Sequence, residues 1–147
     1  MTKSKHQTGV TLIELLIVVA IVAILASLII PSYQDSLRKA RRADGQSVML
    51  ELSQWMERFY TENGRFDQDR AGAGVAASIP AELLSAPKGA NTAFYNLAVA
   101  NLTRETFTIT ATAVAAQAGD KCGNLTLTQT GAKGMSASGF SIDQCWQ

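Results

Sequence analysis

The sequence contains very few of the side chains on which catalytic and metal sites depend. It has one histidine, His6, and two cysteines, Cys122 and Cys145, among 147 residues. With a single histidine, near the N-terminus, the sequence offers little material for a nucleophile with a histidine base, and no pair of acidic residues has a recognisable catalytic spacing. We therefore expect a protein that is not an enzyme and that binds no metal ion or other cofactor.

Net charge is also almost absent. The chain has 13 lysines and arginines against 12 aspartates and glutamates, which gives a formal charge of +1. This balance argues neither for nor against a nucleic-acid partner. Hydrophobic residues make up 47% of the chain and are concentrated in the first 30 positions. The residues after Gly64 suffice for a small core only.

A continuous apolar run fills residues 10–30, and one carboxylate, Glu14, lies inside it. A helix of this length is about 31 Å long, which matches the hydrocarbon thickness of a bilayer. A cleaved secretory signal is the alternative. However, the run is longer than the about 7–15 residues typical of a signal, and no Ala-x-Ala site follows it. The run therefore predicts a membrane-spanning helix.

The charges that flank this run do not settle its orientation. Lys3 and Lys5 precede it, and a basic cluster follows it at residues 38–42. Counting basic residues would place the C-terminal side in the cytoplasm. A pairing of Cys122 with Cys145 would favour an oxidising compartment, and therefore the opposite orientation.

The N-terminus as a whole closely resembles that of type IV prepilins. A short polar, basic leader, residues 1–9, ends in Gly9 and is followed by Val10-Thr-Leu-Ile-Glu14 and an apolar helix that reaches Pro31. The resemblance implies that prepilin peptidase cleaves between Gly9 and Val10, and that Val10 becomes the N-methylated first residue. Most major pilins have Phe at this position, so a valine favours a minor subunit or a pseudopilin. The resemblance also implies a cytoplasmic leader and a head outside the inner membrane.

The resemblance further implies a role in assembly for Glu14 and Pro31. Glu14 lies about one helical turn after the amino terminus that cleavage before Val10 would create. In a filament of parallel helices its carboxylate could pair with the free amine of a neighbouring subunit, and in an apolar interior a paired charge costs less than a lone one. The alternative is that Glu14 merely extends to the lipid headgroups. Pro31 lacks an N–H and is expected to kink or locally open the helix.

An apolar stripe at helical spacing continues the helix well beyond the apolar run. Its members are Val48, Leu52, Trp55, Met56, Phe59 and Tyr60. The dipeptide Asn63-Gly64 predicts the end of the helix. Because the stripe fails at Arg41 and Asp44, we expect the helix to leave the head near Gly45. Its N-terminal half would then face other subunits or lipid.

A basic cluster, Arg38-Lys-Ala-Arg-Arg42, follows the apolar run. The simplest interpretation is a face that is solvated or lies at the lipid headgroups just outside the membrane. The second is pairing between subunits with acidic residues such as Asp35 or Asp44. A nucleic-acid patch is less expected, because no aromatic residues interleave with the charges.

Beyond the helix the pattern predicts a loop region at residues 65–93, with a short helix at Ala81–Leu84, and then short strands. The strands are expected at Phe94–Ala100, Phe107–Ala113, Leu125–Thr128 and Phe140–Ile142, with a turn at Gly131–Gly134. A sheet packed on the apolar stripe would bury both surfaces. This agrees with the α+β fold that the pilin resemblance implies. In that fold a long N-terminal helix, half transmembrane and half packed on the head, is combined with a four-stranded antiparallel sheet.

Cys122 and Cys145 resemble the C-terminal disulfide that bounds the variable, surface-exposed segment of many type IV pilins. Their pairing would close a loop of about 24 residues and stabilise the head by roughly 3.4 kcal/mol in the chain-entropy model. Two free thiols are the alternative.

The resemblance predicts a structural subunit of a type IV pilus, most like the minor pilins of the PilE type, that supports pilus biogenesis, twitching motility and adhesion. The implied partners are other pilin subunits, prepilin peptidase, and the inner-membrane assembly platform with its ATPases. Before assembly the protein would be a single-pass inner-membrane protein with a periplasmic head, residues 31–147. After assembly it would be part of an extracellular pilus.

Two other functions are kept as alternatives. The first is a pseudopilin of a type II secretion system. Major pseudopilins commonly carry a calcium site and lack the cysteine pair, so Cys122 and Cys145 favour a pilus. The second is a DNA-uptake minor pilin whose head binds DNA. Only Lys121 and Lys133, near the predicted disulfide, support a DNA site.

Overall fold

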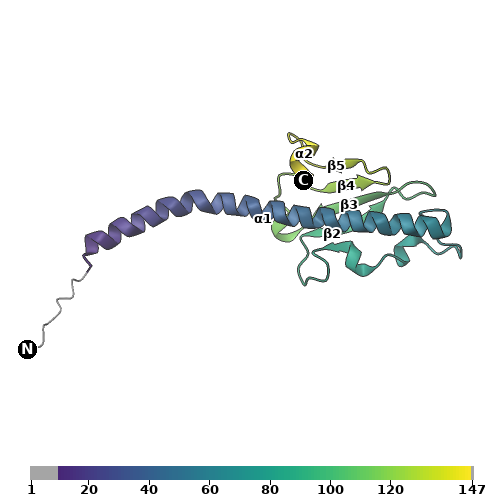
Figure 1. The fold of residues 1–147 in the computed structure, drawn as a ribbon, viewed down its shortest axis with the longest axis horizontal. Helices are drawn as coiled ribbons and strands as arrows, with labels where there is room; N and C mark the ends of the chain where they lie inside the picture. Colours follow the sequence, from purple (N-terminus) through teal and green to yellow (C-terminus); the bar gives the residue numbers. More distant parts are fainter. Residues whose placement is uncertain (1–9, 147) are drawn as a thin grey trace, which may run out of the picture. The chain divides into compact units, whose positions relative to one another are not determined.

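The structure, a computed structural model, describes residues 10–146, so Gly9 and the rest of the predicted leader lie outside the described residues. The chain divides into two compact units with a boundary between Leu37 and Arg38. Helix α1, Leu12–Asn63, contributes to both units. The second unit, the head, adds a β-sheet and short helices to the C-terminal half of α1 (Figure 1).

Helix α1 continues through Pro31, so this proline does not interrupt the helix, and the kink or local opening expected there stays a prediction. Proline removes a single N–H donor, and long apolar helices tolerate this loss. The C-terminal end is where Asn63-Gly64 predicts it. Gly64 adopts a left-handed conformation with φ 71°, and its N–H donates to the Tyr60 carbonyl at 2.7 Å. Glycine is favoured at such a helix end because it has no Cβ.

The head contains a five-stranded antiparallel sheet whose strand order follows the chain order. The strands are β1 (Ser85–Ala86), β2 (Tyr95–Ala100), β3 (Thr108–Ala113), β4 (Leu125–Thr128) and β5 (Lys133–Met135). Three short 3-10 helices, η1 (Val75–Ala77), η2 (Ala81–Leu84) and η3 (Ala115–Gln117), and one α-helix, α2 (Ile142–Cys145), complete the head. The predicted α+β fold, with a long helix and an antiparallel sheet, and the short helix at Ala81–Leu84 are confirmed.

The edges of the sheet differ from the sequence prediction. Strand β1 adds a fifth strand to the four expected, and it contains only two residues. The predicted strand at Phe140–Ile142 is wrong, because Ile142 begins helix α2. Ser141 and Gln144 form a capping box that starts this helix. Strand β5 takes the edge position instead and includes Lys133 and Gly134, where only a turn was predicted.

The C-terminal half of α1 lies across one face of the sheet (Figure 1). The predicted stripe is largely confirmed. Val48, Leu52, Met56 and Phe59 are buried together with Met49, whereas Trp55 is half-buried and Tyr60 is 37% exposed. The sheet meets this stripe with alternate residues of its strands. They are Tyr95, Leu97, Ile109, Ala111, Leu125 and Leu127, all buried.

The head begins at Arg38, so the expectation that α1 leaves it near Gly45 is wrong. Arg42 and Gln46 are 2% and 5% exposed and continue the buried stripe with polar side chains. Arg42 donates to both carboxylate oxygens of Asp120, at 2.8 and 3.0 Å. Gln46 Nε2 donates to the carbonyl of Cys145 at 2.6 Å. A pattern of apolar residues cannot reveal a contact that is made by polar ones.

The predicted disulfide between Cys122 and Cys145 is present, and both cysteines are fully buried. Next to this region, the Gln117 side chain donates to the Arg38 carbonyl and to the Tyr95 hydroxyl, both at 3.1 Å. Burial raises the pKa of Tyr95 above its ordinary value of 10.0. The C-terminal segment is therefore tied covalently to the segment before β4, and by hydrogen bonds to the part of α1 that begins the head.

Candidate assembly site

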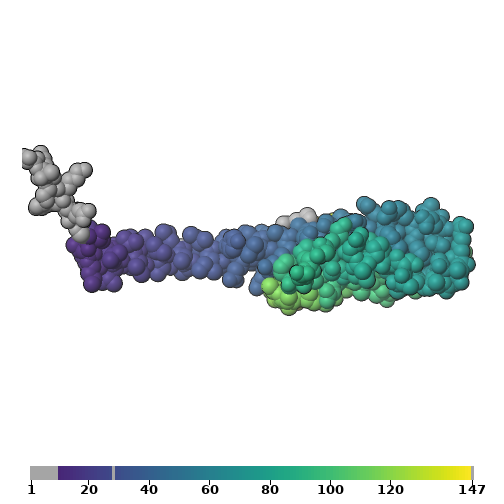
Figure 2. Space-filling view, turned by 90° about the horizontal axis from the view of Figure 1, so that it is seen from below, coloured from purple at the N-terminus to yellow at the C-terminus, as the bar shows by residue number. Residues whose placement is uncertain are grey.

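The N-terminal part of α1 presents apolar side chains on every side. The large apolar side chains from Val10 to Ile30 are 52–76% exposed, that of Leu28 not being described. Figure 2 shows this segment as a rod one helix wide. Among residues 10–146, α1 is the one helix long and apolar enough to cross a membrane. A helix that is apolar all round needs lipid or other helices as its surroundings.

Glu14 is held at the start of this rod by Thr11. The Thr11 N–H and hydroxyl both donate to Glu14 Oε2 at 2.9 Å, and the Glu14 N–H donates back to Thr11 Oγ1 at 3.3 Å. This reciprocal arrangement is a capping box, which satisfies N–H groups that the first turn of a helix leaves free. The carboxylate is also favoured at the positive end of the helix dipole. This cap is not among the features predicted from the sequence, although Thr-x-x-Glu is its known pattern.

The sequence-predicted site residues fall into separate places. Val10, 70% exposed, and Glu14 belong to the same end of the rod. Pro31 follows Glu14 by almost five helical turns, so the two do not form one site. Cys122 and Cys145 belong to the head. The assembly site that the structure supports is therefore a long apolar surface with one carboxylate at its beginning.

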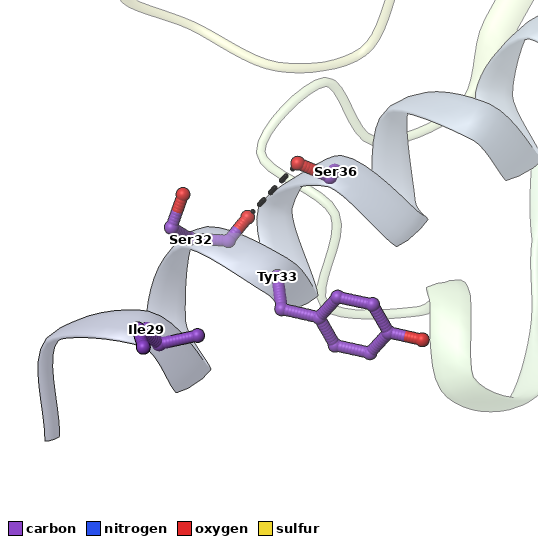
Figure 3. A pocket seen from close by; sticks show the side chains of 4 residues that line it. All are labelled: Ile29, Ser32, Tyr33 and Ser36. Carbon is purple, nitrogen blue, oxygen red and sulfur yellow. Dashed lines mark hydrogen bonds between the residues drawn. The ribbon is translucent and has the colours of Figure 1, made fainter. Parts of the chain in front are cut away.

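Just after the apolar run, the surface of α1 contains both polar and apolar side chains. Ile29, Ser32, Tyr33 and Ser36 line a shallow hollow of about 460 Å³, and the Tyr33 ring is 63% exposed (Figure 3). Ser36 Oγ donates to the Ser32 carbonyl at 3.0 Å, so this hydroxyl is satisfied within the helix. An amphipathic tyrosine at this place is typical of the boundary between a membrane and water.

The head carries one half-buried and one exposed ion pair. Arg65 binds Asp67 at 2.6 Å, and this hydrogen bond lowers the pKa of Asp67 below 3.8. Lys88 binds Glu51 at 2.7 Å. Within the described part of the chain, no three His, Cys, Asp or Glu side chains are grouped so that they could hold a metal ion.

Comparison with known protein families decides the identity. A model described as "Type IV minor pilin ComP, DNA uptake sequence receptor" matches residues 31–126, more than half of the chain. The chain belongs to the type IV pilin family. A model of the prokaryotic N-terminal methylation motif matches residues 4–30 of this pilin. That segment includes Gly9, Val10 and Glu14, whose individual roles stay predictions.

Fimbrial proteins are among the relatives of this pilin, and so is a type II secretion system core protein G of Dickeya chrysanthemi, 28% identical over 52% of this chain and 50% of its own length. Fimbrial protein EcpC of Eikenella corrodens is 36% identical over 50% of this chain and 48% of its own length. Type IV major pilin protein PilE of Neisseria gonorrhoeae is 39% identical over 49% of this chain and 43% of its own length. The chain thus spans half the length or less of these curated relatives.

The crystal structure of the Neisseria meningitidis non-core minor pilin PilV shares the fold. Its TM-score is 0.52 at 19% identity, over 74% of this chain and 95% of that one. The predicted pilin family and the function of a type IV pilin-like minor subunit are confirmed by the family match. The apolar helix indicates membrane anchoring and pilus assembly.

Proposed function

We propose that residues 10–30 anchor this pilin in the inner membrane, with the leader in the cytoplasm and residues 31–147, which include the head, in the periplasm. From there the assembly platform and its ATPases would move it into a type IV pilus as a minor subunit. The uncovered apolar surface of α1 is the observation that supports this proposal. Its side chains need partners that the rest of the described chain does not supply, and other pilin helices would supply them.

Processing would prepare the start of this surface. Prepilin peptidase would cut between Gly9 and Val10, and Val10 would be methylated. The new amine would then lie about one turn from Glu14, whose carboxylate Thr11 already holds in place. In the filament the carboxylate would exchange Thr11 for the amine of a neighbouring subunit. Pro31 would adapt the helix to its neighbours without interrupting it.

Mass spectrometry of sheared surface filaments tests this function. We expect the subunit to be present, to begin at methylated Val10, and to be lost from filaments in the Glu14→Ala variant while it persists in the membrane. Glu57→Ala, an exposed change in the same helix, is the matched control and should be incorporated normally.

A third variant separates the two roles of Glu14. Thr11→Val removes the hydroxyl of the cap but keeps the carboxylate, so incorporation should largely persist. Equal losses for Thr11→Val and Glu14→Ala would show that capping is the role of Glu14. Filaments that retain residues 1–9, or that accept Glu14→Ala as well as the wild type, would contradict the proposal.

Twitching motility and adhesion belong to the same proposal, because a minor subunit acts through the fibre that contains it. Deletion of the gene should reduce surface fibres, twitching and attachment. Loss of protein secretion with intact fibres would instead favour the pseudopilin alternative.

DNA binding by the head is a second candidate function, which the family description favours. Lys133 lies 5.4 Å from the centroid of a Trp146 ring, and Lys121 lies 5.8 Å from that of Phe140. Cations beside aromatic rings suit nucleic-acid strands. Retardation of double-stranded DNA by the full chain in detergent, over a salt series, tests this function. No retardation even at low salt would exclude it.

A further inference from the structure

A hollow of about 230 Å³ on the head is lined by Lys39, Lys121, Phe140 and Gln144. Lys39 comes from α1, Lys121 from the segment between η3 and β4, and the other two from the region of α2. All four side chains are exposed. We call this site the Lys39–Lys121 hollow. The fold thus brings two cations and an aromatic ring together from distant parts of the chain.

The two cations of the hollow are not neutralised by the head. Among residues 10–146, neither Lys39 nor Lys121 forms a salt bridge. Asp120, the neighbour of Lys121, is buried and gives both of its carboxylate oxygens to Arg42. Arg38 adds a third positive charge nearby, since its guanidinium donates to the Gly119 carbonyl at 3.1 Å. The hollow therefore attracts an anion.

The other lining groups define which anion fits. Gln144 Oε1 accepts the Ser141 N–H at 3.0 Å, which holds the side chain in place and leaves both of its amide hydrogens to donate to a ligand. The Phe140 ring is 40% exposed and lies beside Lys121. Ammonium and amide donors suit phosphate oxygens, and the ring suits the apolar part of a molecule that carries the phosphate.

The position of Lys39 in the chain points to a lipid. Lys39 follows Ile30, the end of the apolar run, by nine residues of the same helix, or about 14 Å. The headgroup layer extends about 5–8 Å beyond the hydrocarbon. Side chains of a helix point back toward its N-terminus, and the long lysine stem extends further in that direction. The ammonium of Lys39 therefore reaches the headgroups when residues 10–30 span a bilayer.

We propose that the Lys39–Lys121 hollow binds the phosphate headgroup of an anionic phospholipid and holds the head against the membrane before assembly. The inference rests on the proposed membrane anchoring of residues 10–30. Lys39 contacts the headgroup from α1, and Lys121 and Gln144 contact it from the C-terminal part of the head. Phe140 enters the interface beside them. Transfer into a filament breaks these contacts, since the subunit leaves the lipid.

Lysine acetylation of the full chain in nanodiscs tests the site. One set of nanodiscs contains phosphatidylcholine alone, and the other contains about one third phosphatidylglycerol. We expect the anionic lipid to slow acetylation of Lys39 and Lys121 about fivefold each. Lys88, which is paired with Glu51, and Lys133, which lies over Trp146, are internal controls and should change less than twofold.

Matched variants extend the test to binding itself. Native mass spectrometry counts the phosphatidylglycerol molecules that the full chain retains in detergent. Lys39→Gln/Lys121→Gln should lose the retained lipid, whereas Lys88→Gln/Lys133→Gln should keep it. An intact disulfide and an unchanged near-ultraviolet circular dichroism spectrum verify that both double variants are folded.

Three results would overturn the inference. Equal acetylation of Lys39 and Lys121 in the two lipids, in a chain whose residues 12–30 are protected from hydrogen exchange, refutes the lipid site and leaves the anchoring intact. A chain that does not insert refutes both. Protection of the two lysines only after double-stranded DNA is added to phosphatidylcholine nanodiscs assigns the hollow to nucleic acid.

Discussion

The two halves of helix α1 are one continuous element with opposite surroundings. In the N-terminal half, Leu16 is 57% exposed and is one of many apolar side chains spread over all sides. In the C-terminal half, Leu52 is fully buried against the sheet, while Leu50, two residues earlier, is 48% exposed. The first half is left for lipid or other subunits to cover. The second half is covered by its own chain.

This difference shows that the two halves of α1 are stabilised by different interactions. Nothing in the described chain covers Leu12–Ile30, so that its helix is maintained by its own hydrogen bonds and by the cap at Thr11 and Glu14. The second half is maintained by burial of its stripe. Variants that affect only one half should therefore have separable consequences.

The largest effect is expected where the head begins. Asp120→Ala would leave the buried Arg42 without its partner, and this should lower the free energy of unfolding of the head by about 3–5 kcal/mol. Urea unfolding of the full chain in detergent, followed by tryptophan fluorescence, measures it. The double variant Arg42→Met/Asp120→Leu should recover most of the loss. A single variant as stable as the wild type would show that Arg42 does not need this partner.

The next prediction compares the same change, leucine to alanine, in the two halves of α1. Leu52→Ala creates a cavity under the sheet and should cost about 2–5 kcal/mol of head stability. Leu16→Ala should leave head unfolding unchanged and should instead lower retention of the subunit in filaments. The same urea titration and filament mass spectrometry measure the two outcomes. If Leu16→Ala destabilised the head, the two halves would not be independent.

A smaller effect is expected at Gly45, where α1 packs closely against Tyr95 of the sheet. A Cβ at this position would lie 2.9 Å from Tyr95 Cδ2. The buried Tyr95 ring cannot move aside freely, so Gly45→Ala should destabilise the head by about 1–3 kcal/mol, although alanine favours a helix. The control is Ala43→Gly, an exposed change that should cost about 1 kcal/mol through helix propensity alone. A stabilised Gly45→Ala head would contradict the close packing.

The smallest effect is expected for the exposed pair of Glu51 and Lys88. The hydrogen bond from Lys88 to Glu51 raises the pKa of Lys88 above 10.5. Its stabilising contribution is fully present below the unfolded pKa, near pH 10, and is lost as the pH rises through the folded pKa. Glu51→Gln should therefore lower the urea midpoint slightly at pH 7 and have a diminishing effect at alkaline pH. Glu57→Gln serves as the control at both pH values.

Elements with a strong apolar pattern could be predicted from the sequence. Leu52 and Phe59 share one helical face, and Ile109 and Ala111 alternate with threonines, so the helix stripe and the central strands are evident. Ser85 and Ala86 could not be predicted as a strand, because a segment of two residues is too short to show an alternation of apolar and polar residues. Their pairing exists only because β2 offers an edge.

Other differences between the prediction and the structure arise from buried polar side chains. The start of the head depends on Arg42 and Gln46, which are buried through hydrogen bonds made with residues far along the chain. No local pattern reveals such partners. The caps are different, because Thr11-x-x-Glu14 and Ser141-x-x-Gln144 are both visible in the sequence. For the assembly site, the sequence predicted the apolar surface and Glu14, and the structure added Thr11.

The ties between the beginning and the end of the head have a consequence for quality control. Arg42 is synthesised early, but the carboxylate that it binds belongs to Asp120, which is synthesised much later. Gln46 likewise binds the carbonyl of Cys145, near the end of the sequence. A subunit truncated before these positions leaves the side chains of Arg42 and Gln46 without these hydrogen-bond partners. We therefore expect a chain that ends before Asp120 to be cleaved by proteases faster than the full chain.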